Sequence, residues 1–139
     1  MIAPERLRAA RVLVVDDEPA NVALLEAVLR REGYVAVEGV TDPHRAVERR
    51  LAFDPDLVIL DLMMPGVDGY ALLDALRRVQ PADAFLPVLV LTADTTIEAK
   101  RRALALGARD IVTKPFDVFE LGLRVANLIE LRLLYTLRN

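Results

Sequence analysis

The chain contains four short runs of aliphatic residues, and no polar residue interrupts any of them. They are Val12–Val15, Leu57–Leu60, Val88–Leu91 and the shorter Ile111–Val112. Unbroken runs of this length are typical of strands that are buried on both faces, as strands are in a parallel sheet. A fifth and less purely apolar candidate is Tyr34–Val40. The sequence therefore predicts a parallel sheet that is covered on both sides.

Segments with helical spacing separate and follow these runs. Pro19 precedes apolar residues at intervals of three and four, and Gly33 follows them as a stop signal. A later helix follows the turn signals Pro65-Gly66 and Asp68-Gly69. Three others begin with capping residues, at Asp42-Pro43, at Thr95 with Glu98, and at Asp117 with Glu120. The predicted order is strand then helix, repeated five times.

This alternation predicts an α/β fold with right-handed crossovers between parallel strands. A chain of 139 residues suits one domain, and 54% hydrophobic residues supply its core. We expect a flavodoxin-like (βα)5 domain, doubly wound, with a five-stranded parallel sheet of strand order 2-1-3-4-5. Ligands of such sheets bind beyond the carboxyl ends of the strands, so functional residues are sought there.

Composition excludes several classes of protein. The chain has no cysteine, which rules out disulfides and thiolate metal sites and suits a reducing compartment, so a cytoplasmic location is expected. A formal charge of −3 and the absence of a dense basic run argue against direct nucleic-acid binding by this segment. No apolar stretch approaches the ~20 residues that span a bilayer, so no membrane partner is expected.

Charged and hydroxyl side chains follow four of the predicted strands. They are Asp16 and Asp17, Asp61, Thr92, and Lys114. Carboxylates that share one crevice repel each other unless a cation joins them, and oxygen ligands without His or Cys select a hard ion such as Mg²⁺. The set suits phosphoryl transfer, with Asp61 as nucleophile, the three carboxylates around the metal, and Thr92 and Lys114 on the phosphoryl oxygens.

Four motifs in this order resemble the receiver domain of two-component response regulators: VLVVDDEP (12–19), VILDLMMPGVDG (58–69), LTA (91–93) and TKPF (113–116). The resemblance implies that Asp61 is the phosphoacceptor, served by a sensor histidine kinase, a phosphotransfer protein or a small acyl phosphate. It implies that the chain is a signalling phosphoacceptor rather than an enzyme acting on other substrates. It also implies that the site is completed by the Met63 backbone carbonyl as a metal ligand, by Ala93 beside Thr92, and by a cis bond before Pro115.

One position departs from the family pattern. The family usually has Tyr or Phe three residues before the lysine, and the aromatic ring turns inward on activation. Here the residue is Ile111, which has one stiff χ1 angle and no polar tip. We therefore expect activation to involve Thr92 and residues 93–96, with Ile111 remaining packed.

The predicted domain covers residues 1–129. Residues 130–139 are expected to be a helical extension that starts a connector to an output domain, since the last helical pattern runs from Asp117 to the end of the sequence without a stop signal. The resemblance also implies a switching surface on the predicted fourth helix, fifth strand and fifth helix, through which a homodimer could form.

Three other functions share part of this pattern. Haloacid dehalogenase-like phosphatases also combine an Asp nucleophile with Mg²⁺, but they need a second Asp where this chain has Met63. A flavin-binding electron carrier needs phosphate-binding groups after the first strand, where Asp16 and Asp17 would repel a phosphate. A degenerate receiver that serves only for docking or dimerisation stays open because of Ile111.

Overall fold

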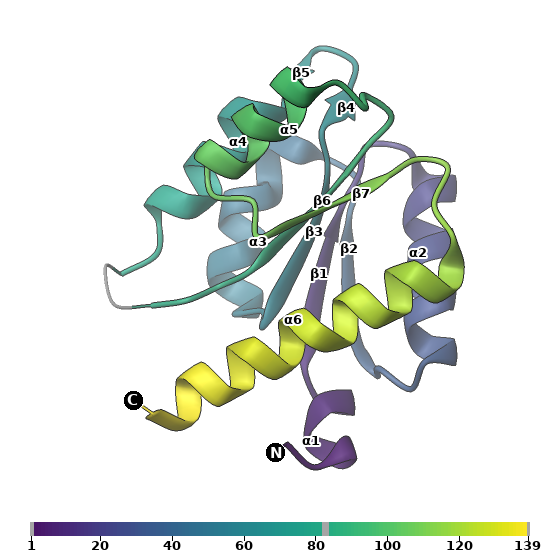
Figure 1. Cartoon of the computed structure of the whole chain (residues 1–139), viewed down its shortest axis with the longest axis vertical. Coiled ribbons are helices and arrows are strands. Elements are labelled where there is room, and N and C mark those ends of the chain that lie inside the picture. Colours follow the sequence, from purple (N-terminus) through teal and green to yellow (C-terminus); the bar gives the residue numbers. More distant parts are fainter. Residues whose placement is uncertain (1, 82–83, 139) are drawn as a thin grey trace.

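Five parallel strands form the centre of the molecule (Figure 1), seen here in a computed structural model that describes residues 2–81 and 84–138. The sheet order is β2-β1-β3-β6-β7, which confirms the predicted order 2-1-3-4-5. The strands are β1 (Arg11–Val15), β2 (Ala36–Val40), β3 (Leu57–Asp61), β6 (Val88–Thr92) and β7 (Asp110–Thr113).

Helices cover both faces of this sheet (Figure 1). One apolar core joins the sheet to α2 and α6, and a second joins the opposite face to α3, α4 and α5. The bounds of these helices are α2 (Pro19–Arg31), α3 (Ala46–Phe53), α4 (Gly69–Arg78), α5 (Ile97–Ala105) and α6 (Val118–Arg138). This double cover explains why the central strands carry unbroken aliphatic runs.

Three short elements were not predicted from the sequence. They are α1 (Pro4–Arg8), the 3-10 turn η1 (Pro43–Arg45), and a two-stranded hairpin of β4 (Met63–Met64) and β5 (Val67–Asp68). None of these helices or strands is longer than five residues, which is too short for a helical or strand-like spacing of apolar residues to be recognised in the sequence. The predicted helix start at Asp42-Pro43 is therefore a 3-10 turn that leads into α3.

The capping prediction for α5 was wrong by one residue. The hydroxyl of Thr96, not that of Thr95, caps this helix and accepts the backbone N–H of Ala99 at 3.2 Å. Asp94 Oδ1 accepts the N–H of Thr96 at 3.0 Å, and this extra turn delays the helix start. The predicted cap Asp117 does accept a first-turn backbone N–H of α6, and Asp68, which was predicted only as part of a turn, caps α4 in the same way.

The three central strands are buried along their whole length except for the first residue of β1. Polar residues at their carboxyl ends are consequently held on an inflexible frame. No helix in the part of the chain that the structure describes combines the length and the apolar character needed to cross a membrane.

Candidate functional site

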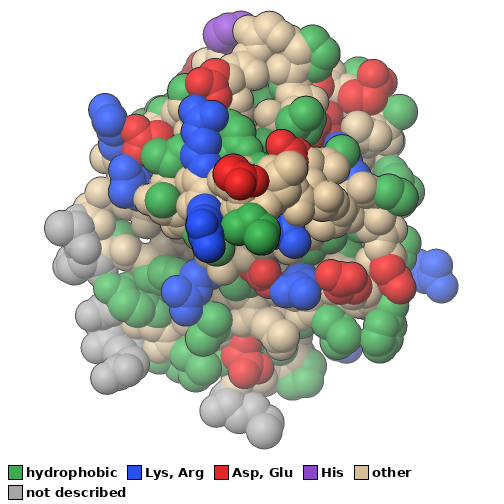
Figure 2. Space-filling model, turned by 45° about the horizontal axis from the view of Figure 1, so that its top comes forward, with side chains coloured by type: hydrophobic (Ala, Val, Ile, Leu, Met, Phe, Trp, Pro, Cys, Tyr) green, Lys and Arg blue, Asp and Glu red, His purple; other side chains and the backbone are tan. Residues whose placement is uncertain are grey.

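Three aspartates meet at the carboxyl edge of the sheet. This edge lies at the top of Figure 1, and Figure 2 turns that end of the molecule toward the viewer. Asp16 and Asp17 follow β1, and Asp61 ends the adjacent strand β3. One carboxylate oxygen from each lies within 4.8 Å of the others. Neighbouring parallel strands thus bring together residues that are far apart in the sequence, as predicted.

Backbone groups orient two of these carboxylates. The N–H of Glu18 donates to Asp16 Oδ1 at 3.0 Å, and the N–H of Met63 donates to Asp61 Oδ1 at 3.1 Å. Asp16 is only 1% exposed and Asp61 only 3%. The carboxylates are therefore fixed in place and largely removed from bulk water.

Lys114 is the cation of this cluster. It follows β7, and its Nζ lies 3.5 Å from Asp16 Oδ2 and 3.4 Å from Asp61 Oδ1. The Lys114–Pro115 peptide bond is cis, the isomer that the family resemblance implies. One ammonium group between two carboxylates, with a third nearby, leaves the cluster with excess negative charge.

The protonation of Asp61 reflects this environment. Burial raises the pKa of its carboxyl above the usual value, and the charge of Asp16 acts in the same direction. The Met63 N–H and the Lys114 ammonium act in the opposite direction without cancelling the effect of burial. In the absence of a further cation, ionisation of Asp61 is therefore less favourable than ionisation of a solvated aspartate.

The next strand contributes a hydroxyl. Thr92 ends β6, is 3% exposed, and its Oγ1 accepts the N–H of Asp94 at 3.1 Å. Its carbonyl oxygen accepts the N–H of Lys114 at 2.8 Å, which ties the ends of β6 and β7 together. Ala93, the next residue, is exposed.

One carboxylate oxygen of this cluster lacks a hydrogen-bond donor in the part of the chain that the structure describes. Asp16 Oδ2 is fully buried and accepts no hydrogen bond from the described residues, although Lys114 lies at ion-pair distance. A buried carboxylate oxygen without a hydrogen-bond donor is costly, and a bound cation removes the cost. An all-oxygen donor set of this kind fits a hard divalent ion such as Mg²⁺.

Comparison with known proteins agrees with this geometry. The sequence profile described as the response regulator receiver domain matches residues 12–126, which is most of the chain. The chain belongs to this family. The receiver domain is a signalling domain of two-component systems, and the four motifs that suggested it all lie within the matched residues.

Several longer regulators are similar to this receiver domain. The transcriptional regulatory protein TrcR of Mycobacterium tuberculosis is 41% identical over 119 residues, which cover 86% of this chain and 45% of TrcR. The response regulator PleD of Caulobacter vibrioides is 39% identical over 125 residues, covering 90% of this chain and 27% of PleD. The chain spans about half the length of relatives such as TrcR, and less of PleD.

Solved structures show the same fold. The chemotaxis protein CheY4 of Vibrio cholerae has a TM-score of 0.78 and 30% identity, with 86% of this chain and 98% of that one covered. The signal receiver domain of a response regulator from Bermanella marisrubri has a TM-score of 0.75 and 34% identity, covering 87% and 98%. The receiver fold is therefore shared over nearly the whole of both solved chains.

Ile111 occupies a partly buried position on β7. Its side chain packs against the core shared by α3, α4 and α5, and its backbone N–H donates to the carboxylate of Asp110 at 2.8 Å. The side chain has no polar atom with which to contact a ligand at the carboxyl edge of the sheet. The departure from the family pattern noted in the sequence is therefore also a packing feature of this receiver domain.

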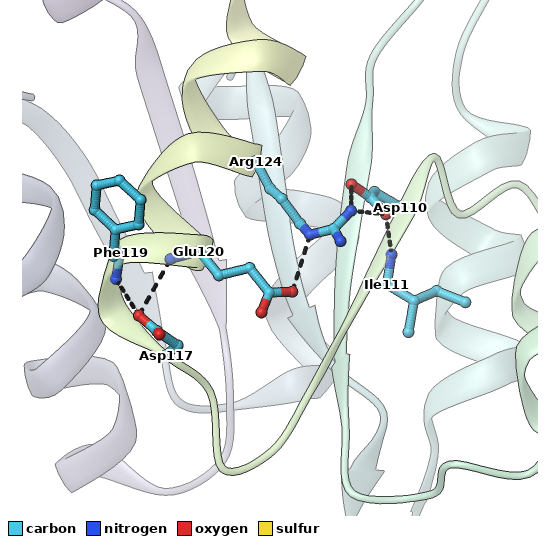
Figure 3. A network of polar contacts seen from close by, with 6 residues as sticks. All are labelled: Asp110, Ile111, Asp117, Phe119, Glu120 and Arg124. Atoms are coloured by element: carbon cyan, nitrogen blue, oxygen red, sulfur yellow. Dashed lines mark hydrogen bonds and ion pairs between the residues drawn. The ribbon is translucent and has the colours of Figure 1, made fainter.

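A charged network that the sequence analysis missed lies beside Ile111 (Figure 3). Arg124 of α6 donates from Nη1 to Asp110 at 2.8 Å and from Nε to Glu120 at 3.1 Å. The spacing of four residues between Glu120 and Arg124 signals their pairing, but nothing in the sequence indicates the contact with Asp110. These ion pairs form within one chain.

Proposed function

We propose that this receiver domain accepts a phosphoryl group on Asp61 in a Mg²⁺-dependent reaction. The observation that carries the proposal is the convergence of Asp16, Asp17 and Asp61 with the Lys114 ammonium at one edge of the sheet. Three carboxylates, one ammonium and one divalent cation together carry no net charge. Such a cluster can accept a dianionic group only when the cation is present.

Each residue has a proposed role. Asp16, Asp17, Asp61 and the backbone carbonyl of Met63 hold Mg²⁺, which when bound offsets negative charge on the phosphoryl oxygens. An oxygen of the Asp61 carboxylate forms the bond to phosphorus, while the bond from phosphorus to the donor's imidazole nitrogen or acyl oxygen breaks. Lys114, Thr92 and the Ala93 N–H are the groups proposed to bind the phosphoryl oxygens.

A sensor histidine kinase or a phosphotransfer protein is the proposed phosphodonor partner. An apolar depression of about 480 Å³ adjoins the carboxylates and includes Leu24, Phe116 and Val118 in its lining. Leu24 and Val118 are exposed. A shallow apolar surface next to the reacting carboxylate is suited to holding a partner that presents a phosphohistidine.

The degenerate receiver is not favoured. A docking module would not need to retain a buried carboxylate beside a second one, because both are costly without a cation. Ile111 has no polar side-chain atom and packs against the core on the α3, α4 and α5 side of the sheet. The retained cluster therefore supports the active function.

Labelling with acetyl phosphate tests this function. We expect covalent phosphate on the purified protein in the presence of Mg²⁺, seen by intact mass, and no labelling in Asp61→Asn. We expect Lys114→Ala to lower the labelling rate by roughly tenfold or more, because a partly buried positive charge that is proposed to bind the phosphoryl group is removed.

The matched control is Asp42→Asn, which changes an exposed carboxylate that caps η1, a position where Asn also caps well. Its labelling should equal that of the wild type. Persistent Mg²⁺-dependent labelling of Asp61→Asn would place the phosphoacceptor elsewhere and overturn the proposal.

Activation should leave Ile111 packed while residues 93–96 move. Ile111 has one favoured χ1 well and is held among core residues, whereas Ala93 and Thr95 are exposed. NMR with and without a phosphoryl mimic would show large shifts for amides 93–96 and a small shift for the Ile111 δ1 methyl. A rotamer change at Ile111 with unchanged amides 93–96 would contradict this expectation.

We further propose that the switching surface consists of α5, β7 and α6, and that a homodimer or another partner binds there. Ile97 and Leu104 expose apolar side chains on α5, and the Asp110–Arg124 ion pair joins β7 to α6. Residues 130–139 would then continue toward an output domain of a longer regulator. The longer relatives support this organisation.

A further inference from the structure

The C-terminal half of α6 crosses the end of the sheet opposite to the phosphorylation edge (Figure 1). The family profile ends at residue 126, but the helix continues to Arg138. Leu128, Ile129 and Leu133 of this continuation are at most 7% exposed and belong to the core on the α2 side of the sheet. The continuation is therefore packed on the domain.

Arg132 makes polar contacts between this continuation and the rest of the domain. Its Nη1 donates to the backbone carbonyl of Phe85 at 2.6 Å, and its Nε lies 3.4 Å from Asp56 Oδ1. The side chains of Arg132 and Asp56 are only 17% and 20% exposed. A charged hydrogen bond that is shielded from water is stronger than an exposed one.

Asp56 extends these contacts to the first strand. Its Oδ2 accepts the N–H of Arg11 at 2.9 Å, and its own N–H donates to the carbonyl of Arg11 at 2.7 Å. Arg11 begins β1, Asp56 precedes β3, and Phe85 lies just before β6. One guanidinium of α6 is thus connected to the starts of the three central strands.

A second contact reinforces the position of the helix. The rings of Tyr135 and Phe85 lie 5.6 Å apart in a tilted arrangement, and the Arg109 guanidinium lies 5.5 Å from the centre of the Phe85 ring. Aromatic pairs in this geometry are attractive. Phe85 therefore contacts α6 through its side chain as well as through its carbonyl.

We propose that Arg132 is a positioning residue that locks the last two turns of α6 onto the base of the sheet. The direction in which any attached segment leaves the domain is then set by the central strands, not by a free helix. These strands carry Asp16, Asp61 and Thr92 at or just beyond their other ends. The inference does not depend on phosphorylation and is tested on the unmodified protein.

Hydrogen exchange measured by mass spectrometry on the full chain tests the anchor. In Arg132→Met, which keeps the aliphatic stem but removes the guanidinium, amides 131–137 should exchange about tenfold faster, as expected for the loss of a charged hydrogen bond. The matched control is Arg124→Met on the same helix, whose ion pairs are more exposed. It should leave the exchange of amides 131–137 within about twofold of the wild type.

A second variant separates anchoring from general stability. Asp56→Asn keeps an acceptor for the Arg11 N–H but weakens the pair with Arg132, so it should speed exchange of the same amides by a smaller factor. Unchanged exchange at 131–137 in Arg132→Met would overturn the proposal, because apolar packing alone would then hold the helix. Equal acceleration in β1, β3 and β6 would also overturn it, since the effect would be global.

Discussion

Replacing Gly69 with alanine is expected to destabilise the domain by about 3 kcal/mol, near the upper end of the cost of overpacking. A Cβ atom at Gly69 would lie 2.7 Å from Leu62 Cα and 2.8 Å from the Leu62 carbonyl carbon, and closer still to the carbonyl oxygen. All three are backbone atoms, which cannot rotate away as a side chain would. The first turn of α4 or the segment after β3 must therefore shift.

Gly66→Ala is the matched control in the same loop. Gly66 has a φ of +74°, and a Cβ built there meets nothing within 4 Å. Its replacement should cost only the left-handed backbone penalty of about 1 kcal/mol. Urea unfolding followed by circular dichroism gives the free energy of unfolding of both variants. A Gly69→Ala protein no less stable than Gly66→Ala would show that the backbone near Leu62 shifts at little cost.

The same substitution should disturb the acidic cluster. Leu62 lies between Asp61 and Met63, so a shift of its backbone moves the N–H group that orients the Asp61 carboxylate. We expect Gly69→Ala to bind Mg²⁺ more weakly than Gly66→Ala, as followed by calorimetry. Equal affinities in two folded variants would show that the cluster is insulated from this turn.

Asp61→Asn is expected to make the metal-free protein more stable at pH 7, by about 1–3 kcal/mol, the cost range of a poorly compensated buried polar group. Ionised Asp61 is buried with Asp16 beside it, and an amide of the same shape removes the like-charge repulsion and part of the desolvation cost. Urea unfolding in EDTA provides the comparison. A less stable variant would mean that the ion pair with Lys114 outweighs burial.

The pH dependence follows from the direction of the pKa shift. Burial raises the pKa of Asp61 in the folded state above its ordinary value of 3.8, so the folded state holds the proton more tightly than the unfolded state does. This stabilising contribution is fully present below pH 3.8 and is lost as the pH rises through the higher folded-state pKa. The advantage of Asp61→Asn should therefore grow with pH across this window and then level off.

Magnesium should narrow the difference in stability between Asp61→Asn and the wild type. A ligand at ten times its dissociation constant stabilises the folded state by about 1.4 kcal/mol. Wild-type protein should gain this amount when Mg²⁺ is added, and Asp61→Asn should gain much less because one carboxylate ligand is missing. Equal gains would indicate that the cation binds without Asp61.

The fold was predictable because its determinants are local in the sequence. Buried central strands require unbroken aliphatic runs, and the runs at Val12, Leu57 and Val88 satisfy that requirement. The acidic cluster was predictable for the same reason, since Asp16 and Asp61 directly follow or end such runs. Residues that follow different strands of a parallel sheet lie at the same edge, so their positions in the sequence predict that they are close in space.

The remaining features depend on distances that a sequence does not contain. The contact between Arg132 and Asp56 joins residues 76 positions apart, and the requirement for glycine at position 69 arises from the backbone of Leu62. The α5 cap was misplaced because Thr95 and Thr96 are the same residue type, and Glu98, three residues after Thr95, suggested a capping box there. Only the turn formed by Asp94 distinguishes them.

Arg124 sets a condition on any association through the α6 side of the domain. Its guanidinium is already shared by Asp110 and Glu120 of the same chain (Figure 3), so an incoming carboxylate must compete with resident ones. Exchanging one ion pair for another yields little net energy. Affinity at this surface would then have to come from exposed apolar side chains such as Ile97 and Leu104. Binding there would respond only weakly to ionic strength.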